Sequence, residues 1–328
     1  MKRSQRLIAL LLLPALFACR SNPNEKGEMT DSEKVGLYFE RALRYYEMRE
    51  LDRCQDQVQR GLEIDPDNER LLLMLGRCYQ TRGTLPDVLA AEKIFRDHPA
   101  KNDYRVHLGL GGAMERKGSF YDQAARNIES GETYTEAADP TARVAELRTN
   151  AQTAWVQAIE SYKLALERFP GSFEALNGLM RTTALAKDYA ASFEWSAQLL
   201  QSISESNNVY IKRQREMESR SEPTAEIEKT LLANESLEID VRIHRAELLH
   251  RSKDLVAALT ELDRAMALDD ARPDIYARRG QLLRELGEYQ RSTDSLERYL
   301  SLSTDPFDHP NVRQAFEWIE ANKHDMGR

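Results

Sequence analysis

The fold is decided by a stretch near the C-terminus of the chain, where residues 273–300 read PDIYARRGQLLRELGEYQRSTDSLERYL. Small and large apolar residues recur in it at spacings of three and four, which place them on one face of a helix. The stretch therefore predicts a pair of amphipathic helices with small residues where the two helices cross.

The same slots recur elsewhere in the chain. Pro66, Pro170 and Asp270 each follow an amphipathic helix. Units begin at about residues 35, 69, 139, 173, 239 and 273, so that the members of each successive pair differ by 34. A fixed period of this kind indicates a repeat protein. The small slots are Cys54 and Gly61, Ala158 and Ala165, and Ala258 and Ala265, with Val58, Tyr162 and Leu262 between them.

The pattern resembles the tetratricopeptide repeat, a helical hairpin of 34 residues. The best agreement is at Tyr276, Gly280, Leu283, Gly287, Tyr289, Ser292 and Leu296, with partial agreement at Leu72, Gly76, Tyr79 and Gly83, and at Tyr38, Tyr45, Cys54 and Gly61. The resemblance implies an all-α solenoid over residues 35–306, in which about eight hairpins stack into a right-handed superhelix. One hairpin cannot bury its apolar face alone, so its neighbours complete the core.

Two of the expected units are irregular. The repeat slots drift within residues 103–138 and are absent from residues 207–238. In the second segment we expect a polar helix over Val209–Ser219, a break at residues 221–223 and then another helix, because proline is tolerated in the first turn of a helix.

The C-terminal residues 307–328 predict a capping helix followed by a tail. Val312, Phe316 and Ile319 are spaced for one helical face. A solenoid needs such a helix, with a polar outer side, to cover the apolar face of its last repeat.

Residues 1–18 have the features of a secretory signal peptide. Positive residues precede an apolar run at residues 7–18, which is too short to span a bilayer, since a spanning helix needs about 20 residues. The run leads into Leu16-Phe17-Ala18-Cys19, which resembles the bacterial lipobox. The resemblance implies that Cys19 carries lipid and becomes the new N-terminus. The alternative is an ordinary signal peptide with a chance cysteine.

The residues after Cys19 bear on where the protein is held. Residues 19–34 are polar and predict a flexible tether. In lipoproteins of this kind an aspartate after the cysteine resembles a signal for retention in the inner membrane, and this chain has Arg20 instead. We therefore expect a protein of the bacterial cell envelope, lipid-anchored in the outer membrane and facing the periplasm.

Charge and cysteine content exclude two classes of protein. The chain of 328 residues has a net charge of −8 and a sequence pI of about 5.5. Nucleic-acid binders need cationic surfaces for phosphate contacts, so we expect no nucleic-acid partner. Three cysteines cannot form a disulfide framework. Whether Cys54 and Cys78 pair stays open.

Residues that carry chemistry are few. The six histidines are scattered without metal-ligand spacing, so no metal or cofactor is expected. Gly109-Leu-Gly111-Gly112 lacks the later Gly-Lys-Ser/Thr of a phosphate loop and is better explained as a repeat slot. Glu160 would be the acid of a cell-wall enzyme, but no residues remain for a catalytic domain, and a solvent-facing glutamate is the simpler interpretation.

The repeat resemblance implies an inner groove lined by the first helix of each hairpin. The matching slots are Arg77, Asn177, Arg181, His244, Arg278, Gln281 and Arg284. An arginine there could receive an acidic segment of a partner; the alternative is a solvated charged face.

These observations predict a non-catalytic, membrane-anchored adaptor that binds other envelope proteins or their peptide segments. One alternative is a self-assembling structural scaffold, including a homodimer, with apolar contacts at its two ends: Tyr45, Tyr46, Phe316 and Trp318. Another is a cell-wall enzyme acting through Glu160.

Overall fold

The computed structural model describes residues 29–133 and 139–327, and the regular structure in these ranges is entirely α-helical. The signal peptide, Cys19 and most of the tether lie outside the described residues. The thirteen helices of the described ranges are α1 Asp31–Glu47, α2 Leu51–Ile64, α3 Glu69–Arg82, α4 Leu85–Asp97, α5 Tyr104–Glu129, α6 Pro140–Arg168, α7 Phe173–Leu185, α8 Tyr189–Ser219, α9 Ala225–Arg251, α10 Leu255–Leu268, α11 Pro273–Glu285, α12 Tyr289–Leu302 and α13 Pro310–Met326.

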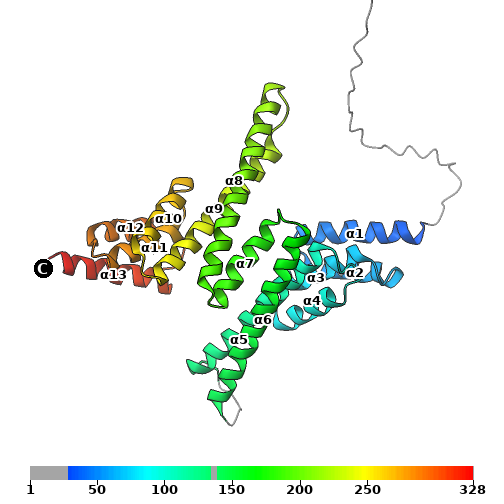
Figure 1. Cartoon of the computed structure of the whole chain (residues 1–328), viewed down its shortest axis with the longest axis horizontal. Helices are drawn as coiled ribbons and strands as arrows, with labels where there is room; N and C mark the ends of the chain where they lie inside the picture. Colours follow the sequence, from blue (N-terminus) through cyan, green and yellow to red (C-terminus); the bar gives the residue numbers. More distant parts are fainter. Residues whose placement is uncertain (1–28, 134–138, 328) are drawn as a thin grey trace, which may run out of the picture.

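The helices pack in the order in which they occur in the chain (Figure 1). Six hairpins, α1–α2, α3–α4, α5–α6, α7–α8, α9–α10 and α11–α12, stack in succession, and α13 packs on α12. Helices in substantial contact are at most two elements apart. The expectation of an all-α solenoid is confirmed for the described residues.

The described residues form six hairpins rather than the expected eight. The segments assigned to two irregular units lengthen α5, α6, α8 and α9 to 26–31 residues, whereas the other helices have 13–17. The helix expected over Val209–Ser219 is the far end of α8, and Pro223 precedes α9. Extending a helix gains a hydrogen bond per residue, whereas starting one is unfavourable, so extra residues lengthen the existing helices. Figure 1 shows the two resulting arms, α5–α6 and α8–α9, projecting in opposite directions.

One tight turn recurs along the stack. Its central residue has a positive φ, its amide bonds the carbonyl three residues back, and the next amide bonds the carbonyl five residues back. This is the Schellman helix ending, which satisfies carbonyls at the helix C-terminus. The turn therefore repeats in the backbone even where the residue at its centre changes: Arg49, Lys187, Ser221, Lys253 and Gly287.

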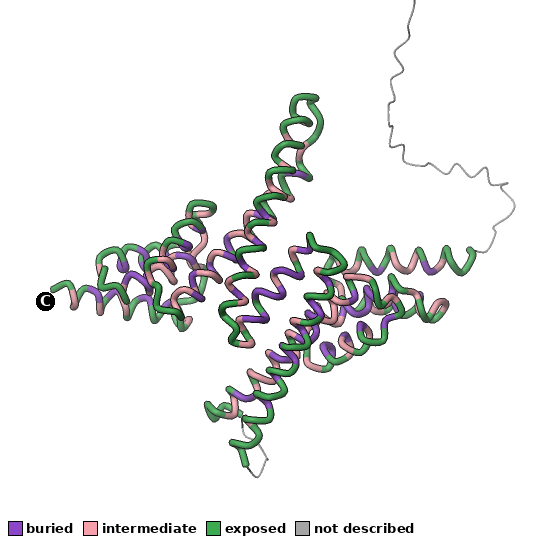
Figure 2. The backbone as a smooth tube through the Cα atoms, viewed as in Figure 1, coloured by how far each residue is buried: buried purple, intermediate pink, exposed green. Residues whose placement is uncertain are grey.

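At several points in the core a large side chain packs directly on a glycine. Phe95 of α4 lies against Gly76 of α3 and Gly109 of α5, where an added Cβ at position 109 would be 2.5 Å from its ring. The same arrangement recurs for Tyr162 on Gly111 and Gly178, Trp155 on Gly118, Leu71 on Gly61, and Leu296 on Gly280. Figure 2 shows the buried residues concentrated where helices meet, whereas the projecting ends of the two arms are largely exposed.

Replacing Gly178 with alanine should destabilise the protein by about 1–3 kcal/mol, because the new methyl group would overlap the buried ring of Tyr162. The matched control is Gly36→Ala in α1, where nothing lies within 4 Å of the added Cβ. That change should be neutral or stabilise by up to about 1 kcal/mol, since alanine is the better helix former. Thermal unfolding of both variants measures the difference, and equal effects would contradict the packing described.

Candidate functional site

A row of four cavities runs along the stack, and we call this row the groove. The cavities have volumes of about 360, 300, 30 and 410 Å³. Glu115 and Arg181 line both the first and the second cavity, and Glu247 lines both the second and the third. Arg278 and Gln281 line both the third and the fourth. Neighbouring cavities are therefore adjacent, and the row extends from α3 to α13.

The first helices of the hairpins supply most of the groove. Six of the residues expected there line its cavities: Arg77, Asn177, Arg181, His244, Arg278 and Gln281. Arg284 lines none of the four cavities. Its guanidinium lies against the capping helix, where it donates to the carbonyl of Trp318 and to the side chain of Asn322. Arg284, which was predicted to share a helix face with Arg278, thus attaches α13 instead of lining the groove.

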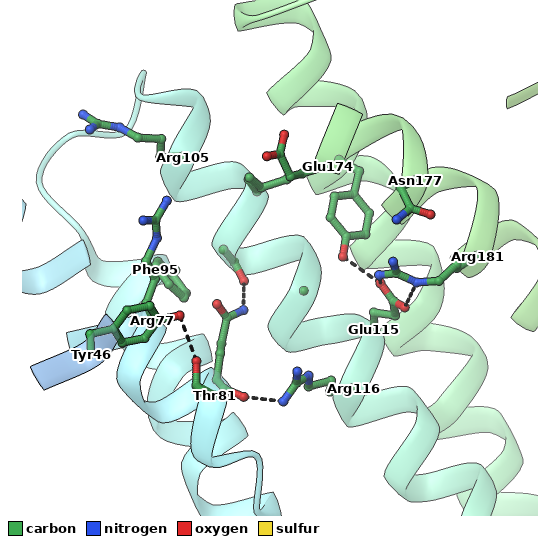
Figure 3. A pocket seen from close by; sticks show the side chains of 15 residues that line it. Tyr46, Arg77, Thr81, Phe95, Arg105, Glu115, Arg116, Glu174, Asn177 and Arg181 are labelled. Atoms are coloured by element: carbon green, nitrogen blue, oxygen red, sulfur yellow. Dashed lines mark hydrogen bonds and ion pairs between the residues drawn. The ribbon is translucent and has the colours of Figure 1, made fainter. Parts of the chain in front are cut away.

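The first cavity lies between α3, α5 and α7, and its walls are fixed by hydrogen bonds (Figure 3). The hydroxyls of Tyr46 and Thr81 are 3.0 Å apart. The side-chain amide of Gln80 donates to the Gly109 carbonyl at 2.6 Å. The guanidinium of Arg116 donates to the Gln80 carbonyl near the end of α3. These bonds join the first three hairpins around the cavity.

A hydrogen-bond network anchored on the buried Tyr162 forms the opposite wall. The Tyr162 hydroxyl donates to Glu115 at 2.7 Å, and Arg181 donates to both oxygens of the same carboxylate at 3.0 Å. Burial raises the pKa of Tyr162, and the charge of Glu115 raises it further, so the phenol keeps its proton and remains a donor. The charge of Arg181 is therefore already neutralised by Glu115.

The other arginines of the first cavity differ in how far their charge is compensated. Arg105 forms an ion pair with Asp103. Arg77 and Arg116 are exposed, and neither has an ion pair among the residues that the structure describes. Figure 3 shows Arg77 on one side of the cavity and Glu115 with Arg181 across from it. The cavity therefore holds two uncompensated cations.

The second cavity contains His244 of α9. Its Nε2 lies 2.9 Å from the hydroxyl of Ser192, which donates to the Met180 carbonyl. Burial lowers the pKa of His244, and nearby arginines lower it further, although Glu247 opposes them. The imidazole is therefore neutral at pH 7. It contributes a hydrogen-bonding group to the wall of the second cavity and no charge.

The remaining predicted groove residues are held by carboxylates. Arg278 forms an ion pair with Glu247. Gln281 donates to Glu285 at 3.2 Å, and Glu285 also contacts the ring of His250 at 2.8 Å. The C-terminal half of the groove is thus internally neutralised, whereas its N-terminal half is not.

Sequence reasoning missed Glu115 and Arg116, although both lie at the centre of the groove. They fall in the segment that we treated as irregular, so no repeat slot was assigned to them. In the structure this segment is the continuous helix α5, which positions Gly109, Gly112 and Glu115 on the side that faces the first cavity. A helix-face comparison of α5 with α3 and α7 would have found them.

The residues predicted to pack the repeats lie in the stack. Buried residues of this group are Cys54, Gly61, Gly76, Ala158, Tyr162, Ala165, Ala258, Ala265 and Gly280, and partly buried ones are Tyr38, Tyr45, Tyr79, Tyr276 and Tyr289. Cys54 and Cys78 are buried in one core cluster as free thiols.

The structure also places the candidates for a phosphate loop, for catalysis and for self-assembly. Residues 109–112 lie within α5, and Glu160 is exposed on α6. Of the residues named for self-assembly, Tyr46 and Trp318 line the groove, while Phe316 is 41% exposed and its ring lies beside that of Phe307. Within the described ranges no helix is long and apolar enough to cross a membrane, and no three potential metal ligands cluster.

Removing the hydroxyl in Tyr162→Phe should destabilise the protein by about 1.5 kcal/mol, because Glu115 loses a buried donor. Tyr299→Phe is the matched control, since Tyr299 is also buried but its hydroxyl has no partner among the described residues. The control should change stability by less than about 0.5 kcal/mol. Denaturant unfolding compares the two, and a larger loss for the Tyr299 variant would refute the network.

Comparisons with known proteins bear on one repeat and on the architecture. The tetratricopeptide repeat family model matches residues 273–306. A comparison with curated protein sequences gives no match.

Similar solved structures cover most of the chain at low identity. PilF of Pseudomonas aeruginosa is 12% identical, with 90% of this chain and 91% of that chain covered and a TM-score of 0.39. A tetratricopeptide repeat protein from Parabacteroides merdae is 13% identical (88% and 99%, TM-score 0.42). The TPR2AB domain of yeast Sti1, in a complex with pHSP90, is 12% identical (89% and 99%, TM-score 0.31). At these scores the structures carry no information on the function of this chain. The family match confirms that the chain resembles tetratricopeptide repeat proteins.

Proposed function

We propose that this protein is a non-catalytic adaptor that binds an extended segment of another envelope protein in the groove. The observation that carries the proposal is the row of adjacent cavities along α3, α5, α7, α9 and α11. Stacked helical hairpins characteristically use such extended surfaces for binding. A row of small adjacent cavities accommodates consecutive side chains of a peptide better than one compact substrate.

The chemistry of the groove supports binding rather than catalysis. Several of its ionisable groups form ion pairs that fix the walls, such as Glu115 with Arg181 and Arg278 with Glu247. Such pairs orient a partner and exclude mismatched charges. Tyr162 keeps its proton, so it serves as a fixed donor to Glu115.

The first test is site-specific photo-crosslinking in native membranes. A photo-reactive phenylalanine analogue at Asn177 lies in the first cavity, and the same analogue at Val256 of α10, which is 68% exposed and lines no groove cavity, is the matched control. We expect discrete partner proteins at position 177 and not at position 256, identified by mass spectrometry. Equal products at both positions would remove the groove from the proposal. Recovery of this chain alone would favour the self-assembling scaffold.

We also propose that the adaptor is held at the outer membrane by lipid on Cys19. The support is the lipobox-like Leu16-Phe17-Ala18-Cys19 and the Arg20 that follows it. Two or more acyl chains anchor a protein firmly, because each buried CH₂ contributes about 0.8 kcal/mol.

Cys19→Ser should abolish labelling by a radioactive fatty acid and move the protein out of the membrane fraction. Density-gradient separation of the membranes of a host with two membranes then locates the unchanged protein. Retention of the serine variant in the membrane fraction at high salt would contradict anchoring through this cysteine.

A further inference from the structure

We propose that the first cavity of the groove binds side-chain carboxylates of an internal acidic stretch in the partner segment, through Arg77 and Arg116. The inference rests on the proposed function, because it names the chemistry of the segment that the groove would hold. Four arginines and two glutamates line this cavity, in a chain whose net charge is −8.

The first step of the argument is which positive charges are available. Asp103 neutralises Arg105, and Glu115 binds Arg181 through both of its oxygens. Arg77 and Arg116 have no carboxylate partner within residues 29–133 and 139–327. An arginine binds a carboxylate through two parallel N–H groups, which gives both strength and direction.

The second step is how the two cations are placed. Arg77 is an exposed residue of α3, and Arg116 belongs to α5. One nitrogen of Arg116 is fixed on the Gln80 carbonyl, so the guanidinium is oriented while its other donors remain available. Figure 3 shows the two guanidinium groups apart from each other, so they suit two carboxylates on one chain better than a single anion.

The third step concerns what the cavity rejects. Glu115 and Glu174 line it together with the arginines, and Glu115 is only 12% exposed. A polyanion with phosphates at every position would bring some of them against these carboxylates, and like charges in close contact are costly. Separate carboxylates interleaved with uncharged residues avoid this repulsion.

The fourth step is that a second cavity adjoins the first one. Glu115 and Arg181 also line the second cavity, which continues toward His244 and Arg251. A bound segment therefore has room to continue past the arginines. This favours carboxylates on side chains within the segment over the single carboxylate at a chain end.

The test uses the full mature chain and fluorescent twelve-residue peptides blocked at both ends. One peptide alternates glutamate and serine, and its counterpart has glutamine in place of glutamate. A third has a single free C-terminal carboxylate on the glutamine sequence, and heparin serves as the polyanion. Fluorescence polarisation measures each affinity at low and high salt, since exposed charge pairs weaken as salt rises.

We expect micromolar binding of the blocked glutamate peptide, with no comparable binding of the other three ligands. Arg77→Gln and Arg116→Gln should each weaken it about tenfold, the loss of one charged hydrogen-bonded pair. Arg213→Gln and Arg215→Gln remove equally exposed charges on the α8–α9 arm and should change affinity less than about twofold. Arg77 makes no hydrogen bond or ion pair in the described chain, so its variant tests recognition without a folding defect.

Several results would overturn the inference. These are no binding of the glutamate peptide, equal binding of the glutamine peptide, equal losses in the arm variants, or preference for heparin or the free chain end. The two proposals fail separately. If position 177 captures no partner, the adaptor function fails, whereas capture that is unaffected by Arg77→Gln and Arg116→Gln removes only the acidic-segment inference.

Discussion

The stacking of the hairpins from α3 to α7 depends on one contact, a large side chain that packs directly on a glycine of a neighbouring helix. Phe95 touches Gly76 in its own hairpin and Gly109 in the next, and Tyr162 does the same with Gly111 and Gly178. Each ring therefore joins two hairpins at once. Because no Cβ intervenes, the helix axes come close together at these points. Residues 179–279 contain no glycine, and the core of α9–α11 uses small alanines instead, at positions 246, 258 and 265.

The same contact prepares the groove. The hydroxyl of Tyr162 extends past the glycines of its neighbours to Glu115, which in turn holds Arg181. A core residue thus fixes the orientation of two charged side chains at the surface. Packing and recognition are coupled here through a single ring, so the first cavity has rigid walls even though its charged groups face solvent.

Period and slot identity made the solenoid predictable, because small residues must recur where helices cross. The number of hairpins was not predictable, since an inserted segment either forms a new hairpin or lengthens existing helices, and both choices keep the helical period. Four of the Schellman turns were hidden as well, because arginine, lysine or serine occupies the left-handed position at residues 49, 187, 221 and 253, where a glycine would give the usual signal. Six groove residues followed from the helix face, whereas Arg284 did not, because its position depends on where α13 docks.

The restriction of helix contacts to near neighbours in the chain has a consequence for how the protein forms. A fold built from such contacts has low contact order, and proteins of this kind fold quickly, because little loop-closure entropy is lost before contacts form. Each hairpin that emerges from the ribosome finds its packing partner already present. The array can therefore assemble progressively from its N-terminal end, without waiting for the last helix.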